Sequence, residues 1–166
     1  MSAATETGQS IFEFASDTEV VMTRIIDAPV ELVFDAHTQP EHLKKWLLGP
    51  DGWSMNVCHI DLRVGGGYRR GWSSDDGSQE SFGFHGVFQE VDRPYRLVHT
   101  EMWGLEGDGP SVLCSYDFSE QSGRTMVTST MRFESKEQRD QILATGMNDG
   151  IAVSYDRLDS VLAAAG

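Results

Sequence analysis

The sequence has few cysteines, and their placement argues against both a disulfide scaffold and a metal cluster. Among 166 residues there are only two, Cys58 and Cys114, far apart and outside any metal-ligand spacing. Each lies in a segment of alternating apolar residues, where a cysteine behaves as a small buried hydrophobe. Two buried free thiols are therefore predicted.

Basic residues are also scarce. The chain has 13 Lys and Arg against 26 Asp and Glu, which gives a formal net charge of −13. A field of this sign repels phosphate backbones and anionic membrane surfaces. We therefore expect neither a nucleic acid nor a membrane as a partner of this acidic protein.

Long apolar runs and targeting signals are missing as well. No stretch approaches the 18 or more apolar residues of a membrane span, and residues 1–17 have no basic start, apolar core or small-residue cleavage site. We expect a soluble cytoplasmic protein, with a flexible N-terminal extension over residues 1–17 and one domain over residues 18–166.

Motifs for metals, cofactors and nucleophilic catalysis are absent. No pair of histidines has the spacing of a zinc helix, so neither a metal nor a cofactor is expected. Gly65-Gly66-Gly67 precedes a strand-like run rather than a helix, which favours a hairpin turn over a phosphate cradle. No serine stands in a Gly-x-Ser-x-Gly frame.

The N-terminal third of the chain is predicted to form a strand followed by two short helices. Residues 19–26 are β-branched enough for a first strand, and residues 11–14 are either a short edge strand or a stretch packed on the domain. Pro29 sits where a helix favours its first residue. Thr38-Gln39-Pro40-Glu41 resembles a capping box that starts a second helix, and a turn is expected over residues 48–52.

Six further strand-like runs follow, and then the hydrophobic period changes. Short breakers rich in Gly, Asp and Pro separate the runs, which predicts hairpins in an antiparallel sheet. Ser135 opens a second capping box, and the next 25 or so residues form an amphipathic pattern that predicts one long helix. An α+β fold follows, with a curved sheet wrapped around the C-terminal helix. The runs are 53–63, 67–73, 81–91, 95–103, 111–119 and 124–133.

This order and a series of short motifs resemble one known family, the activators of heat-shock-protein-90 ATPase, within the START-like (SRPBCC) superfamily. The resemblance covers roughly residues 19–163 and implies a helix-grip fold. The motifs, in family order, are Asp27-Ala28-Pro29 with Val33-Phe34, Trp46 with Gly49-Pro50-Asp51-Gly52-Trp53, Asp61-Leu62-Arg63-Val64-Gly65-Gly66, Phe84-His85-Gly86-Val87-Phe88-Gln89-Glu90-Val91, Arg96-Leu97-Val98, and Gly146-Met147 with Gly150, Ser154 and Arg157-Leu158.

The resemblance further implies that an apolar molecule is held beneath the long helix. On the presumed inner stripe of that helix Gly150 and Ser154 are small, whereas Met147 and Ile151 are large. A glycine inside a helix costs about 1 kcal/mol relative to alanine, so space is wanted there. By itself, a glycine at this position fits close packing of the helix on the sheet and a cavity equally well. The family resemblance favours the cavity.

Aromatic residues supply a wall for such a cavity. The chain has four tryptophans and eight phenylalanines, a set that fits an aromatic-lined pocket. Arg70 alternates in step with Tyr68 and Trp72, so it is expected on the same face of the strand. It either fixes a polar end of the ligand, pairs with a carboxylate such as Glu101, or lies exposed. His85 alternates with the phenylalanines and should point away from them. The predicted ligand-binding residues are Trp46, Tyr68, Arg70, Trp72, Phe84, Phe88, Trp103, Met147, Gly150, Ile151 and Ser154.

Three functions are compatible with these features. The leading hypothesis is a binding protein for a small hydrophobic or aromatic molecule. The second is a polyketide cyclase- or lyase-like enzyme in the same cavity, which would need a buried acid or base with a displaced pKa; no catalytic residue is assigned. The third is a chaperone-associated protein, and a homodimer is a further expectation from exposed strand edges and loop tryptophans.

Overall fold

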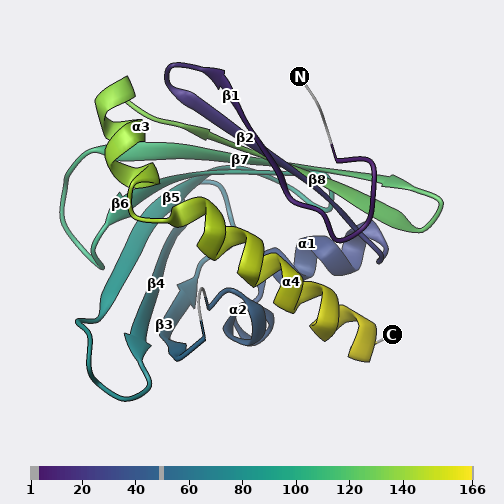
Figure 1. Cartoon of the computed structure of the whole chain (residues 1–166), viewed down its shortest axis with the longest axis horizontal. Coiled ribbons are helices and arrows are strands. Elements are labelled where there is room, and N and C mark those ends of the chain that lie inside the picture. The colour runs from purple at the N-terminus through teal and green to yellow at the C-terminus, as the bar shows by residue number, and fades with distance from the viewer. Residues whose placement is uncertain (1–3, 49–50, 166) are drawn as a thin grey trace.

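The computed structural model describes residues 4–48 and 51–165, and these form one curved sheet with helices on one side of it (Figure 1). None of the helices in these two ranges has the length and apolar content that a membrane span requires. Part of the turn expected over residues 48–52 lies outside the described residues. The elements are β1 Ile11–Ser16, β2 Glu19–Ile26, α1 Val30–Thr38, α2 Pro40–Trp46, β3 Trp53–Ile60, β4 Gly67–Ser74, β5 Phe82–Asp92, β6 Arg96–Trp103, β7 Ser111–Gln121, β8 Arg124–Arg132, α3 Lys136–Leu143 and α4 Met147–Ala165.

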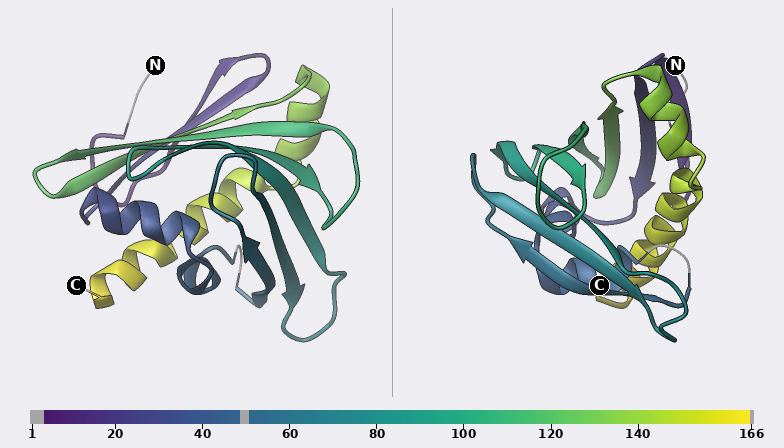
Figure 2. Two further views of the ribbon diagram at one scale, coloured as in Figure 1. Left: turned by 180° about the vertical axis from the view of Figure 1, so that it is seen from behind. Right: turned by 90° about the vertical axis from the view of Figure 1, so that its left-hand side faces the viewer.

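The eight strands form a single antiparallel sheet in the order β1-β2-β8-β7-β6-β5-β4-β3. The sheet curves so that α4 lies across its open side, with α1 and α2 at one end (Figure 2). Alternation gives the strands from β2 to β8 a buried face, as in β7, where Val112, Cys114 and Phe118 point into the core. The predicted helix-grip fold, with its two short helices, is confirmed.

The N-terminal boundary differs from the expectation. Ile11–Ser16 is an edge strand that pairs with β2, so the sheet begins before residue 18. Further upstream, the Ala4 backbone N–H donates to the Thr23 hydroxyl oxygen at 2.6 Å. The prediction of a flexible extension over residues 1–17 is therefore wrong for residues 11–16. This segment pairs with the backbone N–H and C=O groups along the edge of β2, which would otherwise be exposed. Residues 1–3 lie outside the described chain.

Two capping boxes predict helix starts, and a helix begins at each of them, but only one of the two caps is formed. The Ser135 hydroxyl accepts the Gln138 backbone N–H at 3.0 Å and begins α3. The Thr38 hydroxyl instead donates back to the Phe34 carbonyl oxygen at 3.0 Å. Thr38 is thus the last residue of α1, and α2 begins with Pro40 at its first position without a side-chain cap.

The single C-terminal helix expected from the periodic pattern is two helices, α3 and α4. Gly146 has a φ of +84°, in the left-handed region that ends a helix. The backbone N–H groups of Thr145 and Gly146 donate to the carbonyl oxygens of Ile142 and Leu143, each at 3.1 Å, and so complete the last turn of α3. Periodicity does not detect this break because Leu143 and Met147, on either side of it, keep the four-residue spacing of a continuous helix.

A buried arginine fastens the C-terminal half of α4 to the sheet. Arg24 of β2 is 1% exposed, and its Nη2 lies 2.8 Å from Asp156 Oδ1 and 2.7 Å from Asp159 Oδ2. Its Nη1 donates to the Ser10 hydroxyl at 2.7 Å. On the other side of the helix, Arg157 donates to the Trp46 carbonyl oxygen of α2 at 3.1 Å. These contacts fix Asp156, Arg157 and Asp159, in the middle and second half of α4, to β2 and α2.

We predict that Arg24→Met lowers the free energy of unfolding by about 3 kcal/mol, because it removes the cation that compensates Asp159, a carboxylate only 29% exposed; the loss at Asp156, which is 67% exposed, should be small. Urea unfolding followed by circular dichroism measures the loss. The matched control is Arg132→Met, which breaks a pair with Glu19 from a side chain that is 63% exposed and should cost less than about 1 kcal/mol. Equal losses in both variants would contradict the anchoring role of Arg24.

Candidate functional site

A cavity of about 800 Å³ lies between the inner face of the sheet and the helices. Its wall is mostly apolar and reaches the protein surface at Trp103, whose side chain lines it although the residue is 70% exposed. The predicted site residues come from α2, β4, β5, β6 and α4, and the structure brings all of them together in this wall. These are Trp46, Tyr68, Arg70, Trp72, Phe84, Phe88, Trp103, Met147, Gly150, Ile151 and Ser154.

The cavity extends to the N-terminal half of α4, where small residues leave space beside the helix. A Cβ built on Gly150 would meet nothing within 4 Å, apart from its own chain neighbours and helix backbone. One turn later, Ser154 is 2% exposed and also lines the cavity. Of the two interpretations of Gly150, close approach to the sheet is therefore wrong and open space is correct.

Aromatic rings cover the β3–β6 end of the cavity. Trp72 stacks on Phe82 with ring centroids 5.2 Å apart, and Phe82 stacks on Trp103 at 5.8 Å. Phe84 meets Trp103 edge to face at 5.3 Å. The Trp72 indole N–H donates to the Leu47 carbonyl oxygen at 2.7 Å, which fixes the orientation of the ring. The result is an apolar wall of stacked and edge-to-face rings, the two arrangements that aromatic groups favour.

An ion pair supplies the polar part of the wall. Arg70 Nη2 donates to Glu101 Oε1 at 3.1 Å, and the two side chains are 12% and 19% exposed. The Tyr68 hydroxyl donates to the Thr100 carbonyl oxygen at 2.8 Å and also lies 3.2 Å from Glu101 Oε1. The guanidinium carbon is 4.7 Å from the centroid of the Tyr68 ring. Arg70 thus makes the predicted pair with Glu101 and still faces the cavity.

Two histidines in the wall are held neutral. His37 donates from Nδ1 to the Val33 carbonyl oxygen at 2.7 Å, which leaves Nε2 to accept the Tyr155 hydroxyl at 2.8 Å. Burial lowers the pKa of His37 to about 4, against a weaker upward effect of the hydrogen bond to Val33. Burial, with help from the Arg70 charge, lowers the pKa of His99 to about 3.

Sequence reasoning did not select these histidines or Glu101 as site residues, although two signals were present. His99, Glu101 and Trp103 are two residues apart along β6, so their side chains point to the same face of the sheet. The prediction that Trp103 lines the cavity therefore also indicates His99 and Glu101. His37 follows Val33 by four residues on α1, which places it on the same helix face.

The remaining ionisable groups in the wall are protonated and uncharged at neutral pH. Burial raises the pKa of Cys114 and of Tyr155 well above their usual values, and it also raises the pKa of Tyr116. Protonated thiols and phenols are weak nucleophiles. Within the described ranges, no three His, Cys, Asp or Glu side chains gather in an arrangement that could hold a metal ion.

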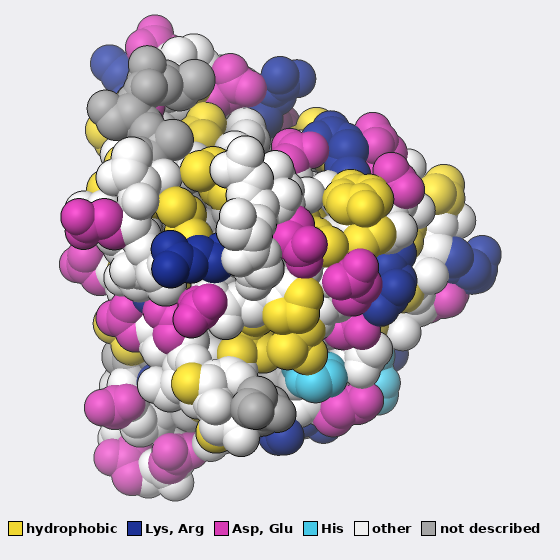
Figure 3. All heavy atoms as spheres, turned by 90° about the vertical axis from the view of Figure 1, so that its right-hand side faces the viewer, with side chains coloured by type: hydrophobic (Ala, Val, Ile, Leu, Met, Phe, Trp, Pro, Cys, Tyr) yellow, Lys and Arg dark blue, Asp and Glu magenta, His cyan; other side chains and the backbone are white. Residues whose placement is uncertain are grey.

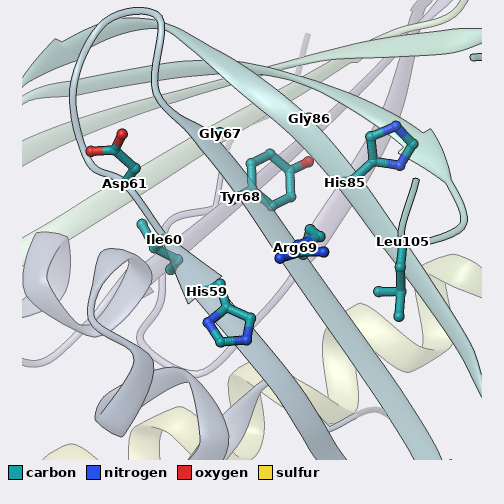
Figure 4. A pocket seen from close by; sticks show the side chains of 9 residues that line it. All are labelled: His59, Ile60, Asp61, Gly67, Tyr68, Arg69, His85, Gly86 and Leu105. Atoms are coloured by element: carbon teal, nitrogen blue, oxygen red, sulfur yellow. The ribbon is translucent and has the colours of Figure 1, made fainter. Parts of the chain in front are cut away.

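A second, shallower depression of about 520 Å³ lies over β3, β4 and β5 (Figure 4). His85 is part of it, and both ring nitrogens lie 2.8 Å from carbonyl oxygens, those of Gly104 and Gly107. His85 does not line the main cavity, as its alternation with the phenylalanines predicts. Because its ring holds the loop after β6, we assign it a structural role.

The fold and sequence together decide the family. Residues 27–163 match the family model described as activator of Hsp90 ATPase homolog 1-like protein. The chain belongs to this family. The resemblance noted from the motifs is therefore confirmed over most of the chain. A search of the curated proteins finds no match.

Solved structures share the fold of this family member. A protein from Rhodobacter sphaeroides is 28% identical, with 93% of this chain and 98% of that chain covered and a TM-score of 0.84. A protein from Nitrosomonas europaea is 26% identical, with 92% and 98% covered and a TM-score of 0.81. An AHSA1-like protein from Aeromonas hydrophila, 23% identical over 85% and 93% with a TM-score of 0.66, supports the fold alone.

We predict that Gly150→Ala raises the free energy of unfolding by up to about 1 kcal/mol, because alanine favours the helix and its methyl group enters open space. Gly86→Ala is the matched comparison in β5, where the new methyl group would overlap the Thr100 carbonyl oxygen and the Tyr68 ring. That variant should lose about 1 to 3 kcal/mol. Urea denaturation of both measures the contrast, and a destabilised Gly150→Ala would argue against the space.

We also predict that stability falls as the pH drops below about 6.5. His37 and His99 stay neutral in the folded protein, whereas the unfolded chain protonates them, so the unfolded state binds more protons until the pH reaches their folded pKa values of about 4 and about 3. The loss at pH 5 should be up to about 2 kcal/mol for each residue. Urea midpoints at pH 7.5 and pH 5 measure it.

The control for this pH dependence is His99→Gln, which removes one titrating group and leaves every carboxylate in place. Its stability should change less between pH 7.5 and pH 5 than that of the natural chain, whatever its stability at pH 7.5. An unchanged difference between the two pH values would show that His99 is not held neutral.

Proposed function

We propose that this protein binds a small hydrophobic or aromatic molecule in the cavity between the sheet and α4. The observation that carries the proposal is the space itself, about 800 Å³ bounded by aromatic rings and by the unfilled position beside Gly150. Ligand pockets commonly have volumes of about 300 to 1,000 Å³ and are mostly apolar with a few polar groups. The cavity has this size and this composition.

The anchoring of α4 supports the same conclusion. Its C-terminal half is held by Arg24 and by the contact of Arg157 with α2, whereas the inner face of its first half lines the cavity with Met147, Asn148, Gly150, Ile151 and Ser154. A preformed cavity supports binding, because less of the binding free energy is lost in ordering the site.

The surface charge narrows the class of partner. Acidic side chains are spread over the face that carries the C-terminus, with smaller hydrophobic areas between them (Figure 3). With a net charge of −13, the chain is a poor match for nucleic acids and for anionic lipid surfaces. This favours a small apolar molecule as the partner.

The cyclase-like alternative has one observation in its favour. It requires buried ionisable groups in the cavity, and His37, His99 and Glu101 line the wall. However, histidines whose pKa values are about 4 and about 3 are weak bases at neutral pH, and an efficient general base has a pKa near the working pH. Binding is therefore the function that we favour, while a chaperone partner rests on the family description alone.

Titration with N-phenyl-1-naphthylamine, an uncharged fluorescent aromatic probe, tests the proposal. We expect saturable binding, and we expect Gly150→Phe to weaken it at least about tenfold because the ring occupies the open space. The matched control is Val153→Phe on the same helix, where the native side chain is 39% exposed and does not line the cavity. Absence of saturable binding, or equal binding by both variants, would refute the proposed function.

A further inference from the structure

The cavity wall contains a compensated pair of charges. Among the described residues that line it, Arg70 and Glu101 are the only two with side chains charged at neutral pH. Their Nη2 and Oε1 atoms are 3.1 Å apart, so the cation and the anion cancel at one place. The pKa of the Arg70 guanidinium is raised by Tyr68 and Glu101 against the effect of burial, which keeps it charged.

The titratable groups around this pair add no charge to it. His37 and His99 are neutral, and burial keeps the phenols of Tyr68 and Tyr116 and the thiol of Cys114 protonated. The polar part of the wall therefore has a net charge of zero while the protein as a whole is strongly acidic.

Arg70 also retains hydrogen-bonding capacity that the protein does not use. Its Nη2 donates to Glu101, whereas its Nε is closed off from the cavity and has no hydrogen-bond partner in the described chain. The side chain lines the cavity and is 12% exposed, so a ligand oxygen can meet the N–H groups at the tip of the guanidinium. A guanidinium has five N–H donors and the bond to Glu101 uses one of them, so the site is suited to a molecule with an acceptor at that end.

We propose that the cavity selects an uncharged aromatic molecule carrying a carbonyl or hydroxyl oxygen, and discriminates against an aromatic carboxylate. This inference rests on the proposed function and adds the ligand class to it. A neutral oxygen accepts a hydrogen bond from Arg70 without changing the charge balance. A carboxylate would place a second anion beside Glu101, and one of the two negative charges would be left uncompensated in a poorly solvated site.

Two probes of nearly the same shape separate these cases, the ketone 2-acetonaphthone and the carboxylate 2-naphthoate. Calorimetric titration at pH 7.5 should show the natural protein binding the ketone at least about tenfold more tightly, since like charges brought together in a binding site are strongly unfavourable. Equal or tighter binding of 2-naphthoate by the natural protein would overturn the inference without the use of any variant.

Charge changes in the pair give a second, independent readout. Glu101→Gln keeps an acceptor for Tyr68 and leaves Arg70 uncompensated, so 2-naphthoate should gain at least about tenfold while the ketone changes little. Arg70→Gln leaves the anion alone and should weaken 2-naphthoate further. The double variant has a neutral wall again and should return to the preference of the natural protein.

The matched control is Glu90→Gln, which changes the net charge by the same amount at a carboxylate that is 54% exposed and pairs with Arg96 outside the cavity. It should leave the ratio of the two affinities unchanged. If both probes bind and Glu101→Gln does not shift this ratio, the inference of ligand class is wrong and the binding function stands. If neither probe binds the natural protein, the inference fails, and the titration with N-phenyl-1-naphthylamine decides whether the binding function stands.

Discussion

The ion pairs of Arg24 are the interaction on which the rest of the molecule depends. They join β2 to Asp156 and Asp159 in the second half of α4, where the guanidinium is almost completely buried. Removing two or more charges from water is costly, and the arrangement persists because the partners meet at hydrogen-bonding distance. The ion pairs lie in the middle and second half of the helix, whereas Met147, Gly150 and Ile151 of its first half line the cavity.

The cavity combines an extensive aromatic surface with a small polar region of zero net charge. Stacked rings from β4, β5 and β6 offer apolar contact area that does not fix the orientation of a ligand. Arg70, Glu101 and Tyr68 offer hydrogen bonds, which are directional. Apolar area supplies most of the free energy of binding, and polar groups determine which ligands are rejected. The buried histidines add no charge, which keeps the wall suitable for uncharged molecules.

Much of the fold follows from local rules. Alternating residues in β7 and β8, short turns and the changed period after Ser135 predict an antiparallel sheet and a C-terminal helical segment, and the structure confirms them. The errors lie where local patterns are ambiguous. Thr38 can cap a following helix or bond back to its own, and Gly146 can continue or end a helix, so the surrounding packing decides in both cases.

The candidate site shows the same division. Strand parity and the small residues of α4 determine from the sequence alone which side chains point inward, because side-chain direction follows directly from backbone geometry. Tertiary structure alone decides what those side chains meet: that Gly150 faces open space, that Arg70 is paired with Glu101 31 residues away, and that Arg24 reaches Asp159 across 135 residues. Such distances depend on how the sheet curves and where α4 crosses it, and no local pattern specifies either.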